Sequence, residues 1–337
     1  MIRHILAIIM VLAGAAKADE VVEEFATGAI NWSKGMVIAQ GFGTSREGMP
    51  AAQRRLLARR AAVVDGQRNL LELTQGVRLT SMTKVVDHLL DDTTTASRVK
   101  GVIRGARPIK ESYQNDIYTV TLAMPIAGDL LYAVYPDGKD IVSLNPGLGR
   151  TRMRLSTVLN TISPYVLWLE RQLIAPVHAG ELFVLGSDND AAAAQRIIKW
   201  IDLNQPADIV GALRQSVNEY AAGEFSGLLI DATQVKNFEL ATIPTIRGHD
   251  GTVIYPNQNT SYSDITNKRG VSYDLDISDA VKNERVARVP LIVRAITTYE
   301  GLPSDLVLPA EDASKIMTSK SAQAAMNKAG VMIVISI

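Results

Sequence analysis

The first strong pattern along the chain is a strand followed by a long helix. Apolar positions over residues 32–42 predict a strand that closes with a glycine-permitted turn at Gly41-Phe42-Gly43. A proline at position 50 then opens a helix that extends to about residue 74. Helical spacing predicts one apolar face against the sheet, made of Ala52, Leu56, Val63 and Leu70.

The pattern from residue 77 to 126 favours strands. Residues 77–85 alternate as a strand does, and the polar stretch 87–95 is typical of a loop. Residues 98–104 and 117–124 alternate again, and Gln114-Asn115-Asp116 supplies the turn of a hairpin. We therefore expect a domain over residues 30–136 in which one long helix crosses a small, mainly antiparallel sheet.

The rest of the chain divides into a helix-rich middle, residues 150–222, and a C-terminal mixed α/β sheet domain, residues 223–337. Proline and glycine clusters near residues 136–147 mark the boundary before the middle segment. The elements expected in the last domain are strands at 227–232, 242–247, 252–255, 289–297 and 331–336, a helical turn at 278–282 and a helix at 310–329. The fold class predicted for the whole chain is α+β.

The first eighteen residues have the pattern of a secretory signal peptide. Arg3 precedes an apolar run over residues 5–16, and Ala16-Lys17-Ala18 fits the small-x-small cleavage pattern. This run is too short to span a bilayer, which needs about 20 residues. We expect cleavage after Ala18, export to the periplasm, and no lipid anchor, because the chain contains no cysteine.

The composition of the chain excludes several kinds of chemical site. With no cysteine, the chain cannot form disulfides, thiolate metal sites or a thiol nucleophile. The four histidines have no metal-ligand spacing, and the glycines around Phe42 lack the small residue that a dinucleotide fingerprint requires at Arg46. We expect no catalytic residue, no metal and no cofactor, and we expect that the protein is not an enzyme.

Basic residues concentrate in the N-terminal domain. Residues 25–136 contain 14 basic and 9 acidic side chains, whereas residues 216–337 contain 11 and 14. Aromatic residues are few, at 5% of the chain, so nucleic acid is not an expected partner. The basic side chains offer a contact surface for an anionic partner or a neighbouring subunit. The residues predicted for this surface are Arg54, Arg55, Arg59, Arg60, Arg104 and Arg107.

The N-terminal domain resembles a family of flagellar envelope proteins. The features that match are the Gly41-x-Gly43 pair, the alanine- and arginine-rich helix over 51–72, and the segments 76–83, 99–106 and 116–126. They resemble the outer-membrane lipoprotein (FlgP-like) family and the N-terminal domain of flagellar H-ring (FlgT) proteins. The resemblance implies an SHS2-like α/β domain, assembly into rings or disks of the flagellar basal body, and no catalysis.

These observations favour a non-enzymatic exported envelope protein that self-associates or docks in a larger assembly, with flagellar or other envelope proteins as partners. Two alternatives remain open at this point. One is a periplasmic binding module for cell-wall glycan or a small anion, which would use the same basic face. The other is a hydrolase whose active site has no sequence signature.

Overall fold

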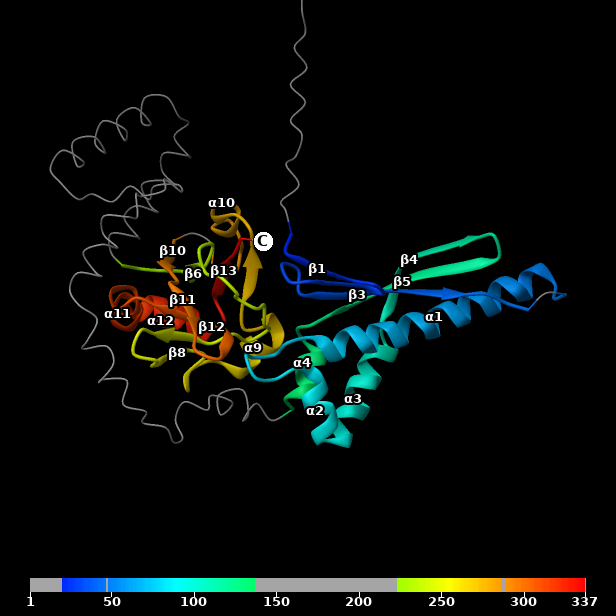
Figure 1. Cartoon of the computed structure of the whole chain (residues 1–337), viewed down its shortest axis with the longest axis horizontal. Coiled ribbons are helices and arrows are strands. Elements are labelled where there is room, and N and C mark those ends of the chain that lie inside the picture. Colours follow the sequence, from blue (N-terminus) through cyan, green and yellow to red (C-terminus); the bar gives the residue numbers. More distant parts are fainter. Residues whose placement is uncertain (1–19, 47, 137–222, 287–288, 337) are drawn as a thin grey trace, which may run out of the picture. The chain divides into compact units, whose positions relative to one another are not determined.

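The computed structural model in Figure 1 describes residues 20–46, 48–136, 223–286 and 289–336. The predicted signal peptide and the predicted helical middle segment lie outside these residues. Contacts group the described residues before position 137 with those from position 225 onward in one compact unit. We call residues 20–136 the N-terminal lobe and residues 223–336 the C-terminal lobe. Both combine helices with sheets, so the predicted α+β class is confirmed.

The N-terminal lobe is an antiparallel sheet of five strands with one long helix against it. The sheet has the order β1-β2-β3-β5-β4, and α1 packs on β3 and β5 (Figure 1). Its elements are β1 (Val22–Phe25), β2 (Gly28–Asn31), β3 (Met36–Gly43), α1 (Ala51–Gly76), α2 (Val85–Asp91), α3 (Thr93–Arg104), β4 (Arg107–Gln114), β5 (Ile117–Pro125) and α4 (Asp129–Val134). The long helix, the strand before it and the hairpin turn are confirmed. Asn115 and Asp116 take positive φ angles in that turn.

The predicted face of α1 is confirmed at Leu70, which is buried, but it is wrong at Ala52 and Leu56, which are exposed. Leu56 is 61% exposed, and the buried positions are Ala58, Ala62 and Gly66, followed by larger residues toward the end of the helix. These three small side chains repeat every four residues and form a narrow stripe against β3. The helix lies so close to the sheet that leucine could not fit between them. Backbone proximity therefore sets the packing of α1 along this stripe, whereas Leu70 and Leu73 fill the core near the end of the helix.

The predicted strands at 77–85 and 98–104 are also wrong, as is the loop between them. Residues 78 and 84 form a single β-bridge, and the chain then enters α2 and α3. Asp92 is the N-cap of α3, because its carboxylate accepts hydrogen bonds from the backbone N–H groups of Thr94 and Thr95 at 2.9 and 3.0 Å. The strand that pairs with β5 is β4, three residues beyond the predicted one.

The C-terminal lobe has two four-stranded sheets. One is parallel, with order β10-β6-β13-β9, and the other is mixed, with order β11-β12-β7-β8. Its elements are β6 (Gly227–Asp231), β7 (Ile246–Gly248), β8 (Val253–Tyr255), α9 (Tyr262–Lys268), β9 (Ser272–Asp274), α10 (Ile277–Ala280), β10 (Pro290–Arg294), β11 (Thr297–Tyr299), β12 (Leu302–Leu308), α11 (Ala310–Thr318), α12 (Lys320–Asn327) and β13 (Val331–Val334). The predicted strands at 227–232, 252–255 and 331–336 are confirmed.

Two predicted elements of this lobe are divided in the structure. The strand at 289–297 becomes β10 and β11, because the Ala295 N–H still donates to Asp231 in the parallel sheet, whereas the Ile296 N–H donates to Val307 in the mixed one. The helix at 310–329 breaks at Ser319, whose hydroxyl caps α12 by accepting a hydrogen bond from the Ala322 N–H at 3.2 Å. The strand predicted at 242–247 is short, since only its last residues enter β7.

Backbone hydrogen bonds and two buried arginines join the lobes. The Thr242 and Ile243 N–H groups donate to the carbonyls of Arg78 and Leu79 at 2.9 and 2.8 Å. The guanidinium of Arg269 donates to the carbonyls of Trp32 and Ser33, and burial lowers its pKa to about 10. Ser81 donates to Asp305 at 2.5 Å, and Asp305 in turn pairs with the buried Arg247. The segment predicted as a strand at 77–85 is thus part of this connection.

Candidate interaction surface

The first half of α1 and the turn end of the β4–β5 hairpin extend together from the N-terminal lobe (Figure 1). We call this part the arm and define it as residues 40–46, 48–68 and 109–119. Three of the predicted arginines link its helix to its hairpin. Arg54 lies 3.6 Å from the carboxylate of Asp116, and the Arg55 guanidinium lies 5.8 Å from the centre of the Tyr113 ring. Their positive charges are thus partly engaged within the arm.

The third arginine, Arg59, forms a two-point ion pair with the hairpin. Arg59 donates two hydrogen bonds to the carboxylate of Glu111, from Nε at 2.9 Å and from a terminal nitrogen at 2.7 Å. The Tyr118 hydroxyl donates to the same carboxylate at 2.5 Å. The hydrogen bonds from Arg59 and Tyr118 lower the pKa of Glu111 to about 2, and its carboxylate raises the pKa values of Arg59 and Tyr118. This network fixes the hairpin against the helix.

We predict that acid releases this contact well below the ordinary pKa of a glutamate. Because the pKa of Glu111 falls from 4.5 to about 2 on folding, the ionised carboxylate stabilises the contact fully above about pH 4.5. The stabilisation is lost as the pH falls toward about 2. NMR of the Arg59 Nε–H signal between pH 6 and about 2 should show its protection from exchange disappear in that window. The Glu111→Gln variant should lack the transition, and loss of protection near pH 4.5 in the unmodified protein would contradict the assignment.

The other three predicted arginines do not join this network. Arg60 extends from α1 on the side away from Phe42 and Arg68. Arg104 is the last residue of α3, and Arg107 is the first residue of β4. The six side chains therefore do not form one patch. They were predicted to lie together because they are close in sequence, but residues 93–104 form a helix and not a strand of the sheet, and Arg60 extends away from the hairpin side of α1.

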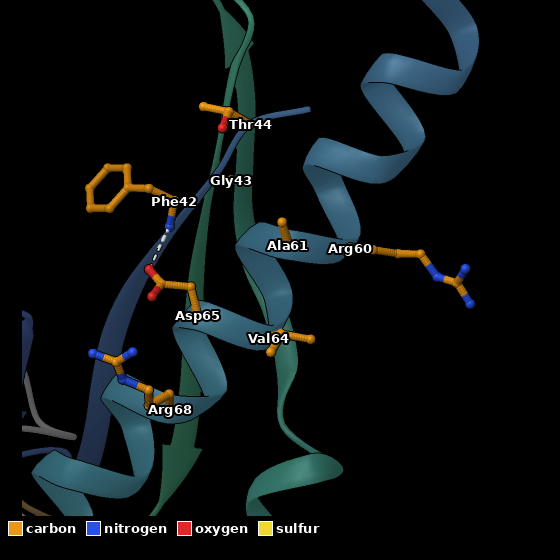
Figure 2. A pocket seen from close by; sticks show the side chains of 8 residues that line it. All are labelled: Phe42, Gly43, Thr44, Arg60, Ala61, Val64, Asp65 and Arg68. Atoms are coloured by element: carbon orange, nitrogen blue, oxygen red, sulfur yellow. Dashed lines mark hydrogen bonds between the residues drawn. The ribbon is translucent and has the colours of Figure 1, made fainter. Parts of the chain in front are cut away.

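A groove of about 560 Å³ lies beside the arm's helix, at the free end of β3. Figure 2 shows Phe42 and Arg68 on one side of this groove, with Arg60 extending away on the other side of α1. The residues that line the groove are Phe42, Gly43, Thr44, Arg60, Ala61, Val64, Asp65 and Arg68. Arg60 is the only member of the predicted arginine set among them.

Gly41 and Gly43 have a different role from the predicted turn. Both lie inside β3, and their φ angles are not positive. A Cβ atom on Gly41 would lie 2.2 Å from the carbonyl oxygen of Ala62, and one on Gly43 would lie 2.1 Å from that of Ala58. The two glycines therefore permit the close approach of α1 to the strand.

The same close approach lets α1 cover the polar edge of β3. Strand β2 pairs with β3 only as far as Ala39, so the following residues of β3 have an open edge on that side. Asp65 accepts the Phe42 N–H at 3.0 Å, and Asn69 donates to the Gln40 carbonyl at 2.8 Å (Figure 2 shows the first). These contacts satisfy the Phe42 N–H and the Gln40 carbonyl, which would otherwise be free to pair with another strand.

The groove presents apolar surface beside positive charge to a partner. Phe42 is 54% exposed and Val64 is 66% exposed, and Leu57 lies about two helical turns before Val64 on α1. The lining also contains Arg60 and Arg68, which outnumber its one carboxylate, Asp65. Such a surface fits a partner that combines apolar and acidic groups. Sequence analysis missed Phe42 and Val64, although the spacing of Leu57, Ala61 and Val64 on one helix face was a signal.

The described residues contain no gathering of three or more histidine, aspartate or glutamate side chains that could hold a metal ion. Among the helices in the described ranges, none has both the length and the hydropathy needed to cross a membrane.

A protein-family model matches the C-terminal lobe. Residues 227–337 match the family described as Treponema pallidum Tp0624, second domain. This range is about a third of the chain and does not include the arm or the groove. No curated protein matches the chain. The resemblance of the N-terminal lobe to flagellar envelope proteins therefore stays a prediction.

Proposed function

We propose that the protein is a non-enzymatic component of the cell envelope that self-associates through its arm. The observation that carries the proposal is the groove, whose lining includes the exposed apolar side chains of Phe42 and Val64 together with Arg60 and Arg68. Large exposed apolar side chains that lie together commonly mark protein contact sites. The groove is open and flanked by charge, as expected of a contact surface rather than of an enclosed active site.

The partner surface that we propose is the acidic C-terminal lobe of a second copy. The two ends of the chain carry opposite charge excess, with 14 basic and 9 acidic side chains in residues 25–136 and 11 and 14 in residues 216–337. A head-to-tail contact of this kind joins two different surfaces, so it builds rings or filaments instead of closed pairs. Charge complementarity would orient the copies, and apolar burial at Phe42 and Val64 would supply most of the affinity.

The proposed location and assembly class are supported by the sequence features. The signal-peptide pattern supports export to the periplasm, and mass spectrometry of the protein from its native cell should find Asp19 at the N-terminus. The N-terminal resemblance supports a ring or disk of the flagellar basal body as the assembly. Loss of motility on deletion of the gene is the expected result, and normal swimming would contradict that assignment.

We predict that the double variant Phe42→Ser/Val64→Ser weakens self-association by about tenfold or more, because it removes the apolar surface that the contact buries. Sedimentation velocity of the purified protein over a range of concentrations measures the effect. High salt should weaken association in the unmodified protein as well, through screening of the charged residues.

The matched control is Leu90→Ser in α2. Leu90 is 79% exposed, so its replacement removes comparable apolar surface outside the arm. This variant should associate like the unmodified protein. A protein that stays monomeric at every concentration and salt, or an equal effect of the two variants, would refute the proposed contact.

A further inference from the structure

A second pocket lies where the two lobes meet, away from the groove on the arm. It has a volume of about 430 Å³ and is lined by residues of both lobes, which belong to one compact unit. Glu23, Trp32, Arg78 and Lys84 come from the N-terminal lobe, and Phe238 and Glu239 come from the C-terminal lobe. The volume is suited to a small molecule and not to a protein chain.

Two walls of this pocket are fixed by contacts among its own lining residues and with Thr242. The Arg78 carbonyl accepts hydrogen bonds from the Thr242 N–H at 2.9 Å and from the Thr242 hydroxyl at 3.0 Å, and the Arg78 guanidinium pairs with Glu239. Trp32 is only 2% exposed, and its indole N–H donates to Glu23 at 3.0 Å. The pocket is thus formed before any ligand arrives, which lowers the entropic cost of binding.

Of the charged residues that line the pocket, some form a salt bridge and others do not. Arg78 and Glu239 neutralise each other, but neither Glu23 nor Lys84 forms a salt bridge with any residue that the structure describes. They also do not pair with each other. The pocket therefore presents one carboxylate and one ammonium group that can each accept an opposite charge. Phe238 adds a half-buried aromatic surface to the same lining.

We propose that this pocket binds a small dipolar ligand that carries both an ammonium group and a carboxylate, such as an α-amino acid or a short peptide with free ends. The ligand's ammonium group lies at Glu23, its carboxylate lies at Lys84, and its apolar part packs on Phe238. A simple anion would face two carboxylates here, and a simple cation would face two basic side chains. A ligand with both charges matches the whole lining.

The inference does not depend on the arm, so its failure and the failure of the proposed self-association are distinguishable. The probes are L-alanine and alanyl-alanine, which separate a free amino acid from a peptide as the source of the two charges. N-acetyl-alanyl-alanine lacks the ammonium group, and alanyl-alanine amide lacks the carboxylate. Isothermal titration or NMR titration of the purified full chain measures binding.

We expect at least one of the two dipolar probes to bind saturably below about 10 mM, and the probe that lacks either charge to bind about fivefold more weakly. Glu23→Gln should remove the preference for a free ammonium group, and Lys84→Met should remove the preference for a free carboxylate. Both variants keep the size of the side chain, and the amide oxygen that Glu23→Gln introduces can still accept the Trp32 indole N–H. Lys100→Met, in α3 and outside the pocket, is the control and should bind as the unmodified protein does.

Equal unfolding temperatures for the three variants and the unmodified protein establish that any loss of binding is local. No saturable binding of either dipolar probe would overturn the proposal. So would affinities that do not change in the Glu23 and Lys84 variants, or equal binding of the blocked peptides.

Discussion

Replacement of Gly41 by alanine is expected to lower the free energy of unfolding of the N-terminal lobe by about 3 kcal/mol. The added Cβ would lie 2.2 Å from both the Ala62 carbonyl oxygen and the Gly66 nitrogen, which are backbone atoms and cannot rotate away. Helix α1 would have to move off β3. That movement would also separate Asp65 from the Phe42 N–H and disturb the groove. Urea denaturation followed by circular dichroism measures the loss.

Gly101→Ala is the matched control for this prediction. Gly101 lies within α3, and no atom lies within 4 Å of the position that its Cβ would take. The same chemical change should therefore stabilise the protein by about 0.5–1 kcal/mol, because alanine favours the helix. Equal effects at the two positions would show that Gly41 is not a point of close contact.

Replacement of Asp305 by alanine is expected to cost about 3–5 kcal/mol of stability. The Asp305 carboxylate pairs with Arg247 at 2.7 Å, and the two side chains are only 2% and 3% exposed. Removing it leaves the Arg247 guanidinium buried without the carboxylate that neutralises it. The variant also loses the hydrogen bond from Ser81 of the N-terminal lobe. Thermal and urea denaturation should both report the change.

The double variant Arg247→Met/Asp305→Ala separates two contributions to the loss of stability. One is the loss of the ion pair, and the other is the cost of burying an arginine that has no carboxylate beside it. Because it removes both charges, it should be more stable than Asp305→Ala alone, with a coupling energy of about 2 kcal/mol or more. The control is Lys282→Ala, which breaks an exposed ion pair with Asp279 and should change stability by less than about 1 kcal/mol. Additive effects at Arg247 and Asp305 would contradict a buried, coupled pair.

Local signals predicted a large part of the fold. The long helix, the hairpin turn at Asn115 and Asp116, and the apolar strands β6 and β13 follow from proline, turn residues and hydrophobic patterning. Residues 98–104 show the limit of this reasoning. Val99 and Ile103 fit a strand by alternation, but with Thr95 they also repeat every four residues, and all three are buried in α3. The Asp92 N-cap decides between the two patterns in favour of the helix.

The candidate site could be predicted only in part, because its form depends on contacts between distant residues. Six arginines were expected to act together, yet three bind the hairpin, and only Arg60 lines the groove. Gly41 and Gly43 fit a turn when considered alone, and their role appears only once Ala58 and Ala62 lie against them. The exposure of Phe42 follows from the early end of β2, which no pattern near Phe42 indicates.

The central claim is that the groove on the arm contacts a second copy of the protein. A photo-crosslinking amino acid at position 64, where Val64 is 66% exposed, tests it most directly. We predict covalent dimers on irradiation, with the attached peptide coming from the C-terminal lobe of another chain, and no dimers when the same group replaces Leu90. Monomers alone after irradiation, or equal crosslinking from both positions, would contradict the claim.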